Sequence, residues 1–190
     1  LKPDVLARAY QTGGASCLSV LTDENYFGGS VTDLQTARAA CDVPVLRKDF
    51  TVDPRDVCDA RIMGADCVLL IAAALSQDEL ARCMEVARFV DIDVLVEVHD
   101  EVELERALLV DAMIIGVNQR DLVTFAVDHD RAVRMGSLMP SHVVRVAESG
   151  VRGRDDALSL RSAGYDAVLV GEHLVTSSNP AAALTDLCVE

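Results

Sequence analysis

The chain has 190 residues, of which 51% are hydrophobic and 4% aromatic, and its formal net charge is −14 at pH 7. A domain of this length can bury a sizeable core. The negative charge and the scarcity of aromatic residues argue against a nucleic-acid partner, because an acidic surface repels phosphate backbones. We interpret most of the acidity as a solubility feature. No apolar run approaches the length of a membrane span, and we expect no signal peptide, so we predict a cytoplasmic protein.

The cysteines and histidines form no recognisable ligand pattern. The six cysteines have no paired spacing, so we expect small buried thiols in a reducing compartment, neither disulfides nor zinc ligands. These cysteines are Cys17, Cys41, Cys58, Cys67, Cys83 and Cys188. The four histidines are scattered, so the sequence predicts no metal site.

Hydrophobic periodicity and end signals predict helices that alternate with strands along the whole chain. The predicted helices are, in order, Pro3 to Thr12, Ser30 to Ala40, Pro54 to Met63, Ser76 to Val90, one from Asp100, Asp128 to Met135, Arg154 to Ala163 and Asn179 to Val189. The predicted strands are Ser16 to Leu21, Val43 to Arg47, Asp66 to Ala72, Asp93 to Glu97, Ala112 to Val117, Val143 to Ala147 and Asp166 to Val170. Because no hairpin or linker interrupts the alternation, we predict a parallel sheet in one domain, residues 1–190.

The helix-to-strand junctions repeat, and the repeat favours a barrel. The segment Gly64 to Leu70 matches Gly164 to Val170, a separation of four units of roughly 25 residues, which suits βα units. Eight helices but seven strands are predicted, and the first element is a helix. We therefore predict a (β/α)8 TIM barrel that lacks its first β-strand in this sequence, since such a barrel closes with eight strands. An open doubly wound sheet is the alternative, but the chain has no glycine-rich dinucleotide loop.

Polar residues gather at the predicted carboxyl ends of the strands, which share one mouth in a barrel. Lys48 ends a short apolar strand, and partial desolvation there would ease proton transfer near neutral pH. A lysine that faces a carboxylate such as Glu97 across this mouth makes an acid/base pair without a metal. A structural ion-pair network is the alternative. The residues that share the mouth are Thr22 to Phe27, Lys48 to Phe50, Ala72 and Ala73, Glu97 to His99, Asn118 to Arg120, Glu148 to Gly150, and Gly171 with Glu172.

Small residues follow the last two strands. Ser149 and Gly150 follow one of them, and Gly171 and Glu172 follow the other. Small residues let backbone N–H groups approach a ligand, and the segment Gly171 to Val175 could form a short extra helix. That combination is the usual phosphate site of such barrels. The alternative is that both glycines only make tight turns.

Several segments together resemble the indole-3-glycerol phosphate synthase family. They are Ser19 to Asp23 with Tyr26 to Ser30, Pro44 to Phe50, Leu95 to Asp100, Gly116 to Leu122, Ala147 to Val151 and Val168 to Glu172. They occur in family order and cover nearly the whole chain. The combination of Leu-Arg-Lys-Asp-Phe with Val-Asn-x-Arg-Asp-Leu is specific to this family.

The resemblance implies a lyase without metal or cofactor, which converts 1-(2-carboxyphenylamino)-1-deoxyribulose 5-phosphate to indole-3-glycerol phosphate with loss of carbon dioxide and water. By the family pattern, Lys48 is the general acid for ring closure and Glu97 is its partner carboxylate. Asn118, Glu148 and Ser149 would orient the substrate and the lysine. Arg120 would hold the anionic substrate. The apolar walls around the anthranilate ring would be Phe27, Phe50, Leu69 and Leu169, and the backbone amides that hold the phosphate would be those of Gly150, Gly171 and Glu172.

The sequence departs from the family pattern in places. The family's first strand carries a catalytic glutamate and a second lysine, which have no counterpart in these 190 residues, so we expect an unclosed barrel without useful turnover. Gln119 occupies a position that varies in the family, and Asp111 replaces a glycine usual in its turn. Other phosphate-binding barrels, similar to phosphoribosylanthranilate isomerase or thiamine phosphate synthase, are one alternative. A non-catalytic barrel fragment that binds a partner is another. Fusion to, or association with, other tryptophan-pathway enzymes is a further expectation.

Overall fold

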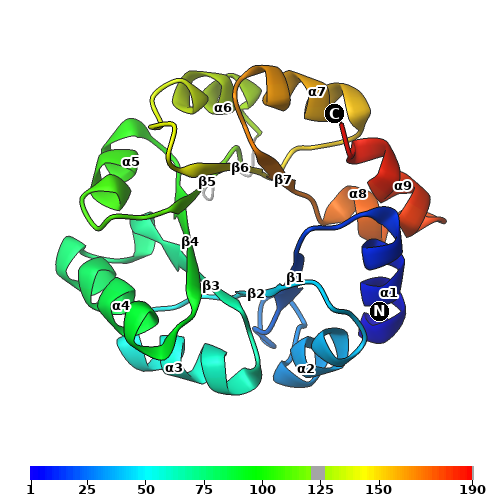
Figure 1. Ribbon diagram of the computed structural model, residues 1–190, viewed down its shortest axis with the longest axis horizontal. Coiled ribbons are helices and arrows are strands. Elements are labelled where there is room, and N and C mark those ends of the chain that lie inside the picture. Colours follow the sequence, from blue (N-terminus) through cyan, green and yellow to red (C-terminus); the bar gives the residue numbers. More distant parts are fainter. Residues whose placement is uncertain (121–126, 190) are drawn as a thin grey trace.

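The computed structural model of the protein describes residues 1–120 and 127–189. Its centre is a parallel sheet of seven strands, and each strand pairs with the next in chain order (Figure 1). The strands are β1 (Leu18–Leu21), β2 (Val45–Lys48), β3 (Cys67–Ile71), β4 (Asp93–Val98), β5 (Ile114–Asn118), β6 (Val144–Glu148) and β7 (Ala167–Leu169). A doubly wound sheet reverses its strand order part-way, so the sequential order excludes that alternative and confirms the predicted barrel architecture.

Helices surround the curled sheet on its outer side (Figure 1). They are α1 (Pro3–Gly13), α2 (Val31–Ala39), α3 (Pro54–Met63), α4 (Gln77–Val90), α5 (Glu101–Leu108), α6 (His129–Gly136), α7 (Arg154–Ser162), α8 (Glu172–Val175) and α9 (Pro180–Leu187), with a 3₁₀ turn η1 (Ala72–Ala74). The predicted short helix near Gly171 is α8. The 3₁₀ turn was not predicted, and its first residue, Ala72, is the last residue of the predicted strand before it.

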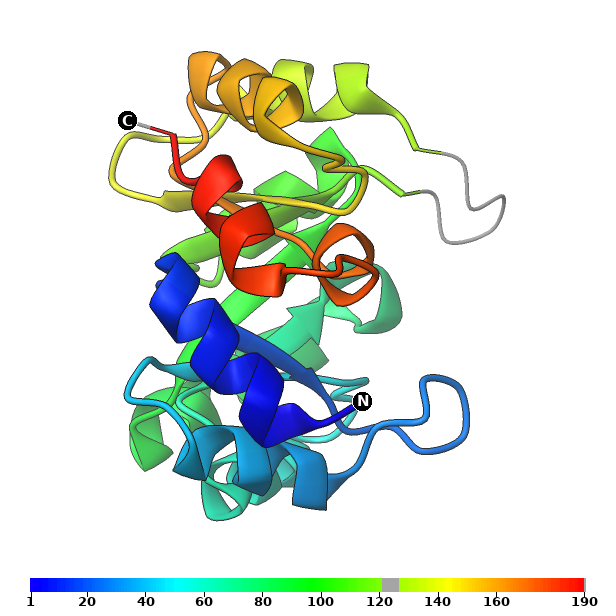
Figure 2. The same ribbon diagram turned by 90° about the vertical axis from the view of Figure 1, so that its right-hand side faces the viewer.

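The strand ring is open among the described residues, but the first and last long helices pack together outside it. Within the described residues, β1 and β7 are hydrogen-bonded to one neighbouring strand each. On the outside α1 packs against α9, the blue and red helices that lie side by side in Figures 1 and 2. The Thr185 hydroxyl donates to the Gly13 carbonyl at 3.1 Å, and a Cβ on Gly13 would lie 2.7 Å from the Ala181 carbonyl oxygen. Glycine is therefore needed where the first and last long helices meet.

The core has two layers, because side chains of a strand alternate between its faces. The larger layer fills the space between sheet and helices and includes Val45, Leu70 and Val96. The smaller layer fills the inside of the barrel. It consists of Leu46, Leu69, Ile71, Leu95 and Val146.

Side-chain caps fix the helix starts as the sequence predicts. The Ser30 hydroxyl accepts the Asp33 N–H at 3.1 Å, and Ser76 with Glu79 forms a capping box. Asp111 has φ +56°, so the turn does require a left-handed residue, which aspartate tolerates better than most side chains.

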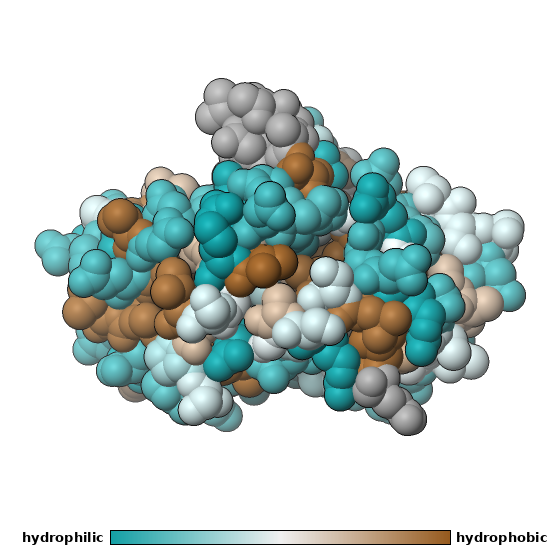
Figure 3. Space-filling view, turned by 90° about the horizontal axis from the view of Figure 1, so that it is seen from above, coloured by the Kyte–Doolittle hydropathy of each residue, from teal (hydrophilic) through white to brown (hydrophobic). Residues whose placement is uncertain are grey.

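The prediction of buried cysteines is wrong for Cys17 and Cys188, which are exposed; Cys41 and Cys83 are buried, and all six thiols are free. On the face in Figure 3, hydrophilic side chains cover most of the surface and hydrophobic ones gather in separate patches. Among residues 1–120 and 127–189, no helix is both long enough and apolar enough to cross a membrane.

Candidate active site

Four side chains from four strands meet at the carboxyl end of the barrel. Lys48 is the last residue of β2, and its ammonium lies 2.8 Å from Glu97 Oε2 and 3.3 Å from Glu148 Oε2. The Asn118 side-chain amide, at the end of β5, donates to Glu97 Oε1 at 3.1 Å. The structure thus brings together the predicted lysine and carboxylate, which face each other across one opening. We call Lys48, Glu97, Asn118 and Glu148 the Lys48 cluster.

Burial and charge give the two carboxylates of the cluster different pKa values. Burial raises the pKa of Glu148 to about 7, and the Glu97 charge adds to this, whereas the attraction of Lys48 offsets only part of it. Burial would also raise the pKa of Glu97, but Lys48 and the hydrogen bonds from Lys48 and Asn118 outweigh it, so that pKa lies below its ordinary value. Near neutral pH Glu97 is therefore ionised, whereas Glu148 can bind or release a proton.

The expectation that desolvation makes Lys48 a readier acid is wrong. Burial alone would lower the pKa of its ammonium, but the two carboxylates outweigh burial, and the pKa lies above its ordinary value. Lys48 is therefore a permanent cation at neutral pH, while the group that can exchange a proton near pH 7 is Glu148.

A glycine makes room for Glu148, a feature that the sequence analysis did not single out. A Cβ on Gly116, in the middle of β5, would lie 1.9 Å from Glu148 Oε1. Within the described residues neither Glu148 oxygen has a well-aligned hydrogen-bond donor, and only the ion pair to Lys48 compensates its charge. A glycine inside an apolar strand is the available sequence signal, since it often marks a close approach.

Behind Glu97 lies His99, whose role the sequence analysis also missed. The His99 Nε2 atom is 3.4 Å from Glu97 Oε1, and Nδ1 is 3.0 Å from Glu103 Oε2 on α5. The His99 backbone N–H donates to the same Glu103 oxygen at 2.7 Å. Burial would lower the pKa of His99, but the two carboxylates raise it above its ordinary value. When His99 is protonated, its positive charge lies beside Glu97 and supports the negative charge of that carboxylate.

The neighbours of Lys48 in its motif pair with each other and not with the cluster. The Arg47 guanidinium donates to Asp49 Oδ2 at 2.9 Å and to the Thr22 hydroxyl at 3.2 Å, and that hydroxyl bonds Asp49 as well. Because successive residues of a strand face opposite sides, Arg47 and Asp49 form a separate ion pair that fixes the strand end, and Lys48 alone enters the cluster.

Beside the cluster, a cavity of about 870 Å³ opens between the ends of β6 and β7. Ser149 and Gly150 have φ +66° and +73°, a tight left-handed turn directly after Glu148. The Arg120 guanidinium lies 3.7 Å from Glu172 Oε2, and the Arg120 backbone N–H donates to Asn118 Oδ1 at 3.0 Å, which links the cavity to the cluster. The lining comprises Arg120, Val127, His129, Ser149, Gly150, Val151, Arg152, Leu169, Val170, Gly171, Glu172, His173 and Thr176.

Comparison with known proteins decides which barrel this is. The profile of the indole-3-glycerol phosphate synthase family matches residues 1–187. Indole-3-glycerol phosphate synthase of Mycobacterium avium (strain 104) is 52% identical over 185 residues, which cover 97% of this chain and 68% of that protein. The synthase of Mycolicibacterium vanbaalenii is 53% identical over the same coverage. The chain belongs to the indole-3-glycerol phosphate synthase family.

Membership in this family makes the chain a carboxy-lyase of tryptophan biosynthesis, with a phosphorylated small molecule as its substrate. Solved structures show the same fold in more distant proteins. A 3-hexulose-6-phosphate synthase has a TM-score of 0.74 at 16% identity, covering 96% of this chain and 92% of its own. Thiamine phosphate pyrophosphorylase from Pyrococcus furiosus has a TM-score of 0.74 at 17% identity, covering 97% and 86%. These two likenesses concern the fold alone.

The apolar residues expected at the synthase mouth lie in three places. Phe27 and Phe50 face each other at the rim with ring centroids 6.0 Å apart, and both are about half exposed. Leu169 lines the cavity. Leu69 is buried in the inner layer of the barrel. Their contact with an anthranilate ring stays a prediction. The Asp121 and Leu122 positions of the family motif lie outside the described residues.

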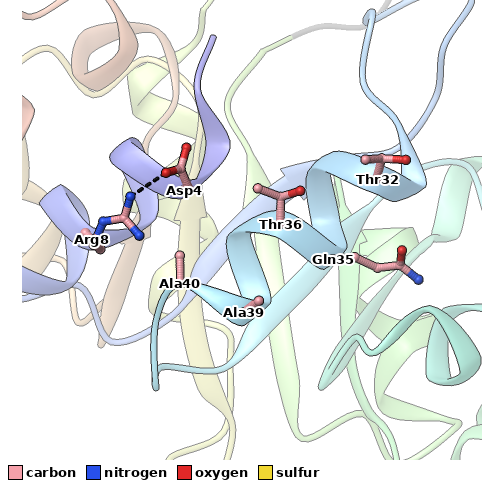
Figure 4. Close-up of a pocket in the computed structure, with 7 residues that line it drawn as sticks. All are labelled: Asp4, Arg8, Thr32, Gln35, Thr36, Ala39 and Ala40. Carbon is pink, nitrogen blue, oxygen red and sulfur yellow. Dashed lines mark hydrogen bonds and ion pairs between the residues drawn. The ribbon is translucent and has the colours of Figure 1, made fainter.

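A second, smaller cavity of about 440 Å³ lies between α1 and α2, away from the synthase mouth. In Figure 4, Asp4 and Arg8 of α1 form an exposed ion pair, and threonine, glutamine and alanine side chains line the α2 side. Apart from Asp4 and Arg8, the side chains that line this cavity carry no charge. Within the described residues, no group of three or more histidine, cysteine or acidic side chains is arranged to hold a metal ion.

Proposed function

We propose that Lys48, Glu97 and Glu148 are the proton-transfer groups for the closure of the indole ring, and that Asn118 and Ser149 orient them and the substrate. The observation that carries this proposal is one ammonium held by two buried carboxylates whose pKa values differ. Such a divided pair supplies both an acid and a base at neutral pH.

The reaction requires these groups to stabilise and protonate the carbonyl oxygen, to protonate the leaving hydroxyl, and to remove one proton. The ring carbon attacks the ribulose carbonyl, whose oxygen becomes a hydroxyl. The Lys48 ammonium stabilises the developing negative charge and donates the proton to this oxygen, and solvent returns a proton to the lysine afterwards. The carboxylate leaves as carbon dioxide, which restores the aromatic ring. The new hydroxyl then leaves as water after protonation. We assign that protonation to Glu148, because its pKa lies near 7, and the removal of the remaining proton to ionised Glu97.

We assign substrate binding to the cavity beside the cluster. Backbone amides at Gly150, Gly171 and Glu172 would hold the phosphate, and Arg120 would face another anionic part of the substrate. Leu169 would form an apolar wall of this cavity, and Phe27, Phe50 and Leu69 would be the further apolar contacts of the anthranilate ring at the mouth. Two observations support this assignment. One cavity is lined by Arg120, Ser149, Gly150, Leu169, Gly171 and Glu172. The first lining residue after β6 is Ser149, which directly follows Glu148 in the sequence.

We further propose that residues 1–190 form one domain, which works in the cytoplasm on small molecules and not on nucleic acid. The core layer between sheet and helices runs from α1 to α9 without a break among the described residues, and the net charge is −14. Fusion to or association with other tryptophan-pathway enzymes stays a prediction.

The test is turnover of the anthranilate-derived ribulose phosphate to its fluorescent indole product by the full-length protein. Lys48→Met should lower kcat by at least about 100-fold, because the charge that stabilises the carbonyl oxygen is lost. The chain has one other lysine, Lys2, which is exposed at the start of α1, so Lys2→Met is a matched control. Equal activity of the two variants would reject the role of Lys48. No product from the unsubstituted protein would reject the substrate.

A further inference from the structure

Gln119 is a fully buried polar residue that the proposed reaction does not use. It follows β5 directly, and its side chain is 0% exposed. The side-chain amide nitrogen donates to the Ser149 carbonyl at 2.9 Å, and the amide oxygen lies 3.0 Å from His129 Nδ1. A buried amide with both ends satisfied holds its neighbours in one geometry.

The chemistry of the three partners fixes the direction of both hydrogen bonds. A carbonyl oxygen only accepts, so the NH₂ end of Gln119 must face Ser149. The amide oxygen then faces His129, and an oxygen needs a donor, so His129 Nδ1 must carry a hydrogen. When His129 is neutral, its ring must therefore be the Nδ1–H tautomer, with Nε2 bare.

The backbone that receives this support is strained. Ser149 has φ +66° and Gly150 has φ +73°, and a left-handed conformation is costly for a residue other than glycine, so surrounding contacts must maintain it. His129 also packs on the second residue of this turn, because a Cβ on Gly150 would lie 3.2 Å from His129 Cε1 and 2.5 Å from Val127 Cγ1. Only glycine fits there while His129 keeps its place.

Gln119 itself has a fixed backbone position. Its N–H donates to the Glu148 carbonyl at 3.0 Å, and its own carbonyl accepts the Asp128 N–H at 2.8 Å. It is thus tied to the end of β6 on one side and to the start of α6 on the other. Its side chain can transmit the position of α6 to the turn after Glu148.

We propose that Gln119 and His129 are positioning residues that clamp the Ser149–Gly150 turn in the conformation that receives the substrate phosphate. The clamp is a property of the fold, and only the identity of its ligand rests on the proposed function. The clamped turn lines the cavity together with His129 and Gly171, so release of the clamp should loosen the binding of an anion there without touching Lys48 or Glu97.

The first experiment reads the clamp without any ligand. In ¹⁵N-labelled protein at a pH where His129 is neutral, the ring-nitrogen shifts should show a bare Nε2 and a protonated Nδ1. Gln119→Met keeps the side-chain length but removes both hydrogen bonds, and should shift His129 toward the Nε2–H tautomer. Gln77 serves as the control, because its amide makes two hydrogen bonds to Arg106; Gln77→Met should leave the His129 signals unchanged. A bare Nδ1 in the unsubstituted protein would overturn the proposal.

The second experiment measures inorganic phosphate binding by the shift of the Gly150 amide signal. Loss of the hydrogen bond to the Ser149 carbonyl in Gln119→Met, or of the bond from His129 that holds the Gln119 amide in His129→Phe, predicts about three- to tenfold weaker binding. His129→Gln, whose amide can donate to the same oxygen, should bind better than His129→Phe. Unchanged affinity in both Gln119→Met and His129→Phe would refute the clamp. No binding by the unsubstituted protein would instead refute the phosphate assignment of the proposed function, and the tautomer would still decide the clamp.

Discussion

Replacement of Glu148 by glutamine should stabilise the fold, by an amount that grows with pH. The carboxyl is fully buried, its oxygens have no well-aligned donor within the described residues, and one ion pair at 3.3 Å is its compensation. Ionised Glu148 is therefore a cost to the folded state that a neutral amide of the same shape avoids. The expected effect is opposite to that of most substitutions in a core.

The magnitude follows from the pKa. The pKa of Glu148 is about 7 in the folded protein and 4.5 for an ordinary glutamate. Between these values the folded state holds a proton that the unfolded chain has released, so stability falls as pH rises through this window. A separation of about 2.5 pH units corresponds to about 3 kcal/mol. Glu148→Gln should therefore be more stable by about 3 kcal/mol above pH 7, and about equal to the unsubstituted protein near pH 4.5.

The assay is urea unfolding followed by circular dichroism, for both proteins at a series of pH values from about 4.5 to about 8.5. The quantity compared is the difference between their free energies of unfolding, because effects of the other titrating groups largely cancel in it. Glu85→Gln, on the exposed side of α4, should show no such pH-dependent gain. A difference that does not change with pH, or a variant that is less stable at high pH, would refute the argument.

Three further predictions concern other close contacts. Gly116→Ala should push Glu148 out of place, because the new Cβ would lie 1.9 Å from its Oε1. We expect the free energy of unfolding, measured in urea, to fall by about 1–3 kcal/mol, and turnover to fall as well. Gly153→Ala, with open space around it, is the control and should be nearly neutral. Gly13→Ala should cost about 1–3 kcal/mol by separating α1 from α9, without a change in KM. For His99, burial would lower the pKa, but two carboxylates raise it above 6.5. The charged ring therefore stabilises the fold fully below pH 6.5, and this effect is lost as pH rises through the folded pKa. The difference in free energy of unfolding between the unsubstituted protein and His99→Gln should shrink at high pH, and a difference that stays constant would contradict the argument.

The architecture was predictable because local signals and tertiary packing agree. Pro54–Met63 was predicted residue for residue, since a proline starts that helix and Gly64 ends it. Strand ends were less certain. β2 includes Lys48, one residue beyond the predicted end, because pairing with a neighbouring strand, which periodicity does not reveal, decides where a strand stops.

The site was predictable where the position of a residue in its strand fixes the direction of its side chain. It was not predictable where a contact depends on how side chains of different elements pack. Lys48 and Glu97 lie at the carboxyl ends of β2 and β4 in one sheet, so their meeting follows from barrel topology. The space at Gly116, the support of Glu97 by His99 and the amide of Gln119 depend on packing between elements distant in sequence. In the sequence, the space at Gly116 is indicated only by a glycine within an apolar strand. The role of His99 is indicated only by its position four residues before Glu103.

The charge count of the cluster determines what it can do. One ammonium can compensate one buried carboxylate well, and Lys48 lies closer to Glu97, at 2.8 Å, than to Glu148, at 3.3 Å. Asn118 adds a further donor to Glu97 alone. The asymmetry leaves Glu148 with a pKa near 7, suited to proton exchange. Any second cation brought within about 4–6 Å of Glu148 would lower that pKa and favour the ionised carboxylate, which would no longer suit the proton-donor role that we propose for it. The acid/base assignment of this synthase thus rests on how many cations reach two buried carboxylates.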